Sequence, residues 1–426
     1  MKYKDTISFI RSLYPDKDFI PLHEPYFAGN EKKYLADCID TTFVSSVGKY
    51  VDRFEEMVKE YTGAKYAIAT VNGTAALHIA LLLAGVQPGD LVITQPLTFI
   101  ATCNAISYCG AKPVFVDVDP DTMGMSPESL ECWLTENVEV VSLNSFELAD
   151  VQPDAAFSTG RSPLNRAQPT QQDEVRSTRR SIQPSSLIAV HKTLRRPISA
   201  CVPMHTFGHP CHIDKIVEIC ARYHIPVVED SAESLGSYYK DRHTGTFGKL
   251  GILSFNGNKT ITTGGGGMVL TDDEHLGPLA KHITTTAKKP HPWKFEHDMV
   301  GYNYRLPNVN AALGCAQMEI LETILANKRE TAMRYQEFFA GIPDIQYRTE
   351  PAQSISNFWL NVILLKDHIQ QELFLKETNA NKVMTRPAWR LMSELEMFKN
   401  SICGDLSISK EIADRLVNIP SSCRVE

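Results

Sequence analysis

The sequence predicts an α/β fold in which helices cover a mainly parallel sheet, with a smaller α+β domain following it. Up to about residue 300, short apolar strands alternate with helical segments. This alternation is typical of a parallel sheet covered on both faces. From about Asn303 onward, helical stretches dominate and the alternation stops. The length of 426 residues is also too great for one compact core.

The first half of the predicted elements follows directly from apolar spacing. Val51 to Tyr61 has Phe54, Met57 and Val58 on one side, as in an amphipathic helix. Further helices are expected at Ala75 to Ala84, at Phe99 to Tyr108, and after Ser126, which is followed by Pro127 and can cap the helix. Apolar runs predict strands at Ala64 to Thr70, Leu91 to Thr94 and Lys112 to Val118.

The second half contains shorter strands and longer helices. Buried strands are expected at Ala200 to His205, Pro226 to Asp230 and Gly251 to Phe255, with a helix at Asp214 to Tyr223. Beyond Asn303 the sequence predicts helices at Val309 to Thr323 and Lys328 to Phe339, and a strand at Asn357 to Leu365. We therefore expect a large domain over residues 26–300 and a small domain over 301–426, with residues 1–25 packing near the small one.

One stretch does not fit this pattern. Residues 142–190 are rich in Ser, Arg, Gln and Pro and show no sustained period. Such a composition buries little apolar surface, which predicts a mobile insertion. The alternative is a basic, partner-binding insert built on Arg176, Arg179 and Arg180.

Composition narrows the classes of function. The net charge is −7 and no basic stripe is present, which argues against nucleic acid as a partner. The ten cysteines form no C-x-x-C pair, so neither a zinc site nor a disulfide scaffold is expected. No apolar run has the length of a signal peptide or a membrane span. These features predict a cytoplasmic protein with no metal.

Lys259 lies between two other signals. The apolar run Ile225 to Val228 ends in Glu229 and Asp230, and four glycines begin at Gly264. A lysine amine, a carboxylate and phosphate donors are the groups that pyridoxal phosphate (PLP) requires for its Schiff base, its ring nitrogen and its phosphate. Asp230 alone could equally be a helix N-cap, but its pairing with Lys259 favours the cofactor role.

Weaker signals complete this hypothesis. Ser254 ends a strand and could bind phosphate, or could be a turn serine. Gly73 and Thr74 begin a helix whose free N–H groups could also bind phosphate. The alternative is that they form an ordinary helix start. Phe99 could stack on the cofactor or belong to the core. His205, at a strand end, could contact cofactor or substrate, although a structural histidine is the more common outcome.

Five motifs together resemble the DegT/DnrJ/StrS sugar aminotransferases, which are fold type I PLP-dependent enzymes of the aspartate aminotransferase superfamily. They are Asn72 to Leu77, Pro96 to Thr102, Glu229 to Glu233, Ser254 to Lys259 and Gly301 to Arg305. The resemblance covers nearly the whole chain outside residues 142–190. Three further stretches are similar to the branch that acts in legionaminic acid and related bacterial glycan pathways. They are Val202 to Pro210, Met384 to Trp389 and Val417 to Ser422.

The resemblance implies a role for each candidate residue. Lys259 would form the Schiff base, Asp230 would hold the ring nitrogen, Thr74 and Ser254 would bind phosphate with Gly73 beside them, and Phe99 would stack on the ring. Glu233 stands near the ring where many relatives have glutamine. Asn303 would reach the phosphate in the neighbouring subunit of a homodimer with shared active sites. His205, Arg305 and Arg386 are candidate substrate contacts.

The resemblance also implies a reaction. An amino group would pass from L-glutamate to the 4-keto group of a UDP-linked 6-deoxy-N-acetylhexosamine, with the freed Lys259 amine as general base. Sibling dehydratases resemble this family but carry histidine at the lysine position. The alternatives are a perosamine-type or 3-amino sugar aminotransferase, and a non-catalytic regulator that binds PLP or a nucleotide sugar.

Overall fold

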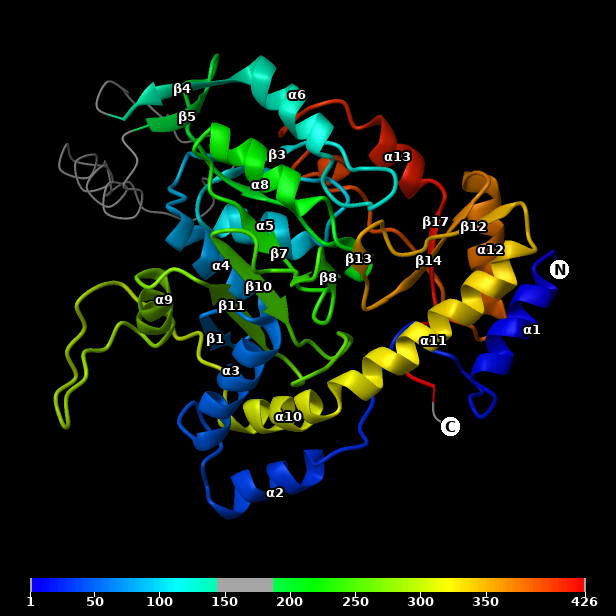
Figure 1. The fold of residues 1–426 in the computed structure, drawn as a ribbon, viewed down its shortest axis with the longest axis horizontal. Helices are drawn as coiled ribbons and strands as arrows, with labels where there is room; N and C mark the ends of the chain where they lie inside the picture. Colours follow the sequence, from blue (N-terminus) through cyan, green and yellow to red (C-terminus); the bar gives the residue numbers. More distant parts are fainter. Residues whose placement is uncertain (1, 144–186, 425–426) are drawn as a thin grey trace.

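The structure is a computed structural model that describes residues 2–143 and 187–424 (Figure 1). Most of the polar stretch predicted as a mobile insertion lies outside the described residues. Its two ends are described, and they form an antiparallel pair of strands, β4 (Val138–Ser142) and β5 (Leu187–His191). The prediction for residues 187–190 is therefore wrong, because Ile188, Ala189 and Val190 are buried in a strand.

The main sheet consists of two four-stranded sections. In spatial order the first contains β1 (Tyr66–Thr70), β11 (Gly267–Thr271), β10 (Leu250–Ser254) and β7 (Val228–Asp230). The second contains β6 (Ile198–Val202), β2 (Leu91–Thr94), β3 (Lys112–Phe115) and β16 (Ile402–Cys403). Parallel bridges from Cys201 to Val227 and from Met204 to Asp230 join the two sections. All pairs are parallel except those of β11, which runs antiparallel to both of its neighbours. The mainly parallel sheet is therefore confirmed, whereas β11 was not foreseen.

Helices cover both faces of this sheet. One face packs against α4 (Gly73–Ala84), α5 (Ile100–Tyr108) and α9 (Leu276–Thr284). The other face packs against α3 (Lys49–Thr62) and α10 (Asn308–Glu319) at one end, and against α6 (Pro127–Asn137) and α8 (Ile213–Arg222) at the other. At the start of α6, the Ser126 side chain accepts the N–H of Ser129 at 3.1 Å, as its predicted capping role requires.

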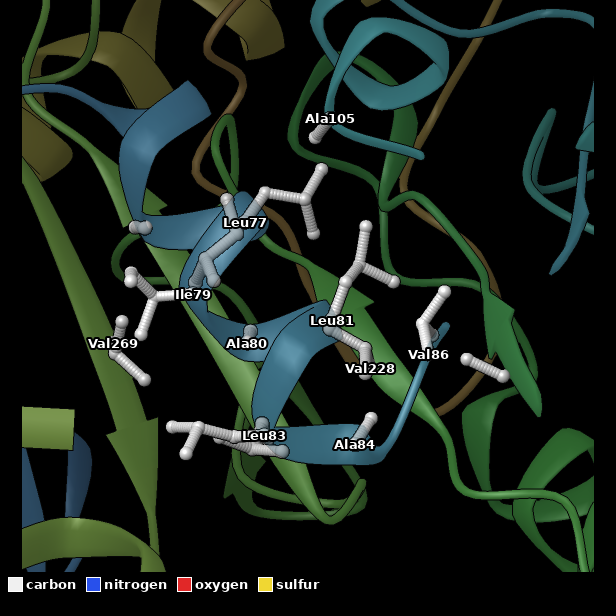
Figure 2. Packing of buried hydrophobic residues seen from close by; sticks show 14 of the residues in the cluster. Leu77, Ile79, Ala80, Leu81, Leu83, Ala84, Val86, Ala105, Val228 and Val269 are labelled. Atoms are coloured by element: carbon white, nitrogen blue, oxygen red, sulfur yellow. The ribbon is translucent and has the colours of Figure 1, made fainter. Parts of the chain in front are cut away.

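Helix α4 is the central helix of this arrangement. Its residues are apolar nearly all round, which is typical of a helix buried on every side. Figure 2 shows Leu77, Leu81 and Leu83 of α4 in the same cluster as Val228 of β7 and Val269 of β11. This packing fixes the N-terminus of α4 relative to the carboxyl ends of β7 and β10.

The C-terminal part forms a second sheet. It contains β12 (Ile345–Tyr347), β14 (Asn361–Leu365), β17 (Leu416–Ile419) and β15 (Arg386–Pro387). Around it lie α1 (Lys4–Leu13), α11 (Leu321–Ala340), α12 (His368–Ala380) and α13 (Ser407–Ala413). Helix α2 (Glu31–Asp40) lies elsewhere and packs against α10. Short strands β8 (Tyr238–Tyr239), β9 (Arg242–His243) and β13 (Ser354–Ile355) form a third small sheet.

The N-terminal helix α1 packs in this C-terminal region. Ile7 and Ile10 of α1 share a core with Tyr335, Phe374 and Val417. The predicted domain boundary at residue 301 does not match the packing, however. Helix α10 packs on α3 and α2, and its buried residues belong to a core of the main sheet.

Two local boundaries also differ from the prediction. Strand β14 begins at Asn361 and not at Asn357, because Phe358 has a left-handed backbone with φ of 49°, which no strand accommodates. The long helical stretch after Val309 is divided at Ile320 into α10 and α11. Of the helices within the described ranges, none combines the length and the hydropathy that a membrane crossing needs.

Candidate active site

Lys259 lies in the loop after β10, with its amine held by two neighbours. Its Nζ atom is 3.1 Å from Glu233 Oε1 and 4.1 Å from the centroid of the Trp359 ring. The Lys259 side chain is only 12% exposed. Burial raises the pKa of the Glu233 carboxyl to about 7, although the neighbouring Lys259 lowers it. A lysine amine is therefore fixed at the carboxyl edge of the sheet.

Asp230 ends β7 and is buried. Its Oδ2 atom accepts the Thr102 hydroxyl at 2.7 Å, and its Oδ1 atom accepts the Ala232 N–H at 3.2 Å. Burial raises the pKa of this carboxyl, while the Thr102 and Ala232 hydrogen bonds lower it. A buried carboxylate is stabilised best by a positive partner, and the protonated ring nitrogen of a bound pyridine is such a partner.

The third group of residues forms a possible phosphate site at the start of α4. The Asn72 side chain caps this helix by accepting the Ala75 N–H at 2.8 Å. Ser254, at the end of β10, lies directly against Gly73, where an added Cβ would come within 2.8 Å of Ser254 Cβ. Because the first N–H groups of a helix lack partners within the helix, this end favours an anion.

The glycine run after Lys259 allows this close approach. Gly264 has a left-handed φ of 80° and turns the chain between β10 and β11. A Cβ added at Gly267 would lie 2.4 Å from the carbonyl oxygen of Asn72. The close approach and the unusual dihedral that a glycine run permits are therefore both present.

These groups surround one cavity of about 310 Å³. Seven predicted site residues line it, namely Gly73, Thr74, Phe99, Asp230, Glu233, Ser254 and Lys259. An amine, a carboxylate and a helix N-terminus with a hydroxyl thus face the same space. These three groups match the aldehyde carbon, the ring nitrogen and the phosphate of PLP respectively.

The chain belongs to the DegT/DnrJ/EryC1/StrS aminotransferase family. The model of this family matches residues 25–143 and 174–426, which is most of the chain. The protein is therefore an aminotransferase that uses PLP, and members of its family use keto sugar nucleotides with an amino donor.

Individual relatives agree with this assignment. The GDP-perosamine synthase of Escherichia coli O157:H7 is 32% identical over 95% of this chain and 93% of its own length. The putative PLP-dependent aminotransferase EpsN of Bacillus subtilis is 32% identical over 91% of this chain and 88% of its own. The crystal structure of the aminotransferase TlmJ from Streptoalloteichus hindustanus has the same fold, with a TM-score of 0.76 and 22% identity over 95% of this chain and 93% of its own. The expected fold type I architecture is confirmed, whereas the legionaminic acid branch stays a prediction.

Four other predicted residues of the aminotransferase do not line the cavity. The geometry contradicts a substrate contact for His205, which is fully buried with both ring nitrogens occupied. Nε2 lies 3.0 Å from Glu229 Oε2, and Nδ1 accepts the Cys211 N–H at 3.2 Å. His205 therefore supports the sheet as a structural residue.

The remaining three lie at the surface. Arg305 Nε donates to Asn303 Oδ1 at 3.1 Å, and Asn303 is exposed. Arg386 is also exposed and donates to Asn379 Oδ1 at 3.3 Å. Within one subunit none of them reaches the cofactor cavity, so their roles stay predictions that concern a partner subunit or a large substrate.

The structure adds residues that the sequence did not single out. Trp359 and Trp389 line the cavity. The Thr102 hydroxyl donates a hydrogen bond to the Asp230 carboxylate. Trp389 stacks on Phe207 with centroids 4.9 Å apart and lies 6.0 Å from the ring of Phe99. Both tryptophans come from the C-terminal part of the chain, so local patterns could not place them beside Lys259. Thr102 follows Phe99 by one helical turn, and that spacing was an available signal.

Proposed function

We propose that this aminotransferase transfers the amino group of L-glutamate to the 4-keto carbon of a nucleotide-linked 4-keto-6-deoxy sugar. The observation that carries the proposal is the cavity in which Lys259, Asp230 and the start of α4 converge. The choice of a 4-keto acceptor is supported by the resemblance to 4-aminotransferases and by the relatives named GDP-perosamine synthase.

Each residue has a distinct task in this reaction. Ser254, Thr74 and Gly73 bind the phosphate, Asp230 holds the ring nitrogen protonated, and Phe99 covers the ring. When bound, PLP supplies an electron sink for the bond that breaks at the amino-donor carbon. Lys259 Nζ, once freed by the donor, is the base that takes the proton from this carbon.

The size of the cavity places the acceptor. About 310 Å³ is near the lower end of the range for small-molecule sites, so the cofactor occupies most of the space. The nucleotide must then extend past Phe99 and Trp389 to the rim. Phe99, which is 46% exposed, and Trp389 form an aromatic ledge there that can pack against the apolar face of a 6-deoxy sugar.

A panel of acceptors tests the proposed substrate. UDP- and GDP-linked 4-keto-6-deoxy sugars and a 3-keto sugar nucleotide are each incubated with the holoenzyme and L-glutamate, and the products are read by mass. We expect amination of a 4-keto acceptor, with one base preferred by at least about tenfold in kcat/KM. A GDP preference would identify a perosamine-type enzyme. Exclusive use of the 3-keto sugar nucleotide, or use of none of the acceptors, would contradict the proposal.

We also infer that the enzyme acts as a homodimer with shared active sites. Residues after α9 form a hairpin arm that projects from the body (Figure 1), with Lys289 N–H donating to Glu296 O at 2.8 Å. Trp293, Phe295 and Val300 on this arm are 77%, 79% and 86% exposed. Such apolar exposure is typical of an interface. Asn303 lies where the arm returns to the body, which suits contact with a partner's phosphate site.

Mixed dimers test this sharing. Lys259→Ala lacks the amine and Asn303→Ala lacks the predicted partner contact, so each variant alone should be impaired. The two variants are mixed while unfolded and are then refolded together. About a quarter of wild-type activity should return, since half of the dimers are mixed and each mixed dimer has one intact site of two. Refolding each variant alone is the control. No gain on mixing, or a monomeric wild-type protein, would contradict shared sites.

A further inference from the structure

The Lys259 amine lies between a carboxylate and an aromatic face. Glu233 Oε1 is 3.1 Å from Nζ, and the centroid of the Trp359 ring is 4.1 Å from Nζ. Glu233 and Trp359 are 2% and 4% exposed. A carboxylate and the face of an indole ring both attract an ammonium group, and both do so more strongly where water is excluded.

Hydrogen bonds hold both walls of this site in place. The Phe207 N–H donates to Glu233 Oε2 at 2.9 Å, which leaves Oε1 for the amine. Trp359 is tied to the lysine loop, because its Nε1–H donates to the carbonyl of Asn258 at 2.6 Å. The site is therefore built, and does not result from one flexible side chain meeting another.

Asn357 connects the two walls. Its Nδ2 atom donates to the carbonyl oxygen of Glu233 at 2.8 Å, and its Oδ1 atom accepts the Trp359 N–H at 2.8 Å. The same amide also donates to the carbonyl oxygen of Leu235 at 2.8 Å. Because Asn357 is buried, these bonds keep the segments that carry Glu233 and Trp359 in a fixed relation.

An aminotransferase needs such a site because its lysine alternates between two states. The amine is bonded to the cofactor at rest and is free while the cofactor carries the amino group. A free lysine side chain has four rotatable bonds. If they are unrestrained, Nζ spends a smaller fraction of time near the reacting carbon.

We propose that Glu233 and Trp359 form a docking site for the Lys259 amine during the part of the cycle in which it is free. Glu233 is a positioning residue here: Oε1 accepts a hydrogen bond from Nζ, while Nζ itself takes up and returns the proton of the donor carbon. The proposal rests on Lys259 being the cofactor-linking amine. The pKa of Glu233, about 7, agrees with a buried carboxylate whose charge depends on this partner.

A structure of the holoenzyme converted to its pyridoxamine phosphate form tests the docking directly, since Lys259 is then free. We expect Nζ within about 3.5 Å of a Glu233 carboxylate oxygen and over the Trp359 ring. An amine directed elsewhere, for example toward Ser254 or solvent, would overturn the proposal.

Glu233→Gln supplies the kinetic test, since it keeps the shape and removes the charge. The single-turnover rate with L-glutamate, followed as the loss of the visible cofactor band, should fall about tenfold, with little change in the glutamate concentration for half-maximal rate. Trp359→Phe keeps an aromatic face and should lose less. Glu55→Gln is the matched control, because Glu55 pairs with Lys281 at 2.6 Å and does not line the cavity.

Two outcomes distinguish the docking proposal from the assignment of Lys259 as the cofactor-linking amine. Borohydride reduction of the wild-type holoenzyme, with peptide mapping, should place the cofactor on Lys259. Label on another lysine would end both ideas. Label on Lys259 together with an unchanged single-turnover rate in Glu233→Gln would overturn the docking role alone.

Discussion

Lys259→Ala should abolish turnover, with a loss of at least about 1,000-fold in kcat, because both the cofactor linkage and the general base are removed. The visible absorbance band of lysine-bound cofactor should disappear as well. Both are measured on purified protein with added PLP.

Lys281→Ala is a suitable control for this experiment. Lys281 also forms a pair with a glutamate, Glu55, but lies outside the cavity. It should keep the visible band and the wild-type rate. A Lys259→Ala protein that kept the band and full activity would contradict the assignment of the linking amine.

Asp230→Ala should retain bound cofactor but lose activity, by about 100-fold or more, because the ring nitrogen loses the charge that keeps it protonated. Asp230→Asn keeps the shape and the contact with Thr102, so it separates loss of charge from loss of packing. We expect both variants to bind PLP at the phosphate and lysine ends. Cofactor content is read by absorbance after desalting, and kcat by the acceptor assay.

Thr102→Val supplies a graded comparison. It removes the 2.7 Å hydrogen bond to Asp230 and leaves the carboxylate in place, so its loss of rate should be smaller than that of Asp230→Asn. Near wild-type rates in Asp230→Asn would count against the ring-nitrogen role.

The sequence was most informative where the chemistry depends on short spacing. Asp230 and Ser254 end the neighbouring strands β7 and β10, and Lys259 lies in the loop after β10. The convergence of the three residues therefore followed from the parallel pairing of these strands. The start of α4 joined them because its glycine approaches Ser254 closely. Local turns and strand ends position these groups, and both can be predicted from sequence patterns.

The sequence was least informative where a contact depends on packing between distant segments. Trp359 and Trp389 reach the cavity only because the C-terminal part folds back over the sheet edge, and nothing near either residue indicates this. His205 looked like a site residue because it follows a strand, yet its ring turns to Glu229 and is buried. The domain boundary was misplaced because α10, although it follows residue 301, has the apolar face that covers α3.

We propose that Lys259 moves an amino group from glutamate to a keto sugar nucleotide. The most direct measurement is the mass of the sugar nucleotide after incubation with ¹⁵N-labelled L-glutamate and the preferred 4-keto acceptor. We expect one ¹⁵N atom in the product with the wild-type enzyme and none with Lys259→Ala. An unlabelled sugar nucleotide with the wild-type enzyme, or equal labelling with both proteins, would contradict it.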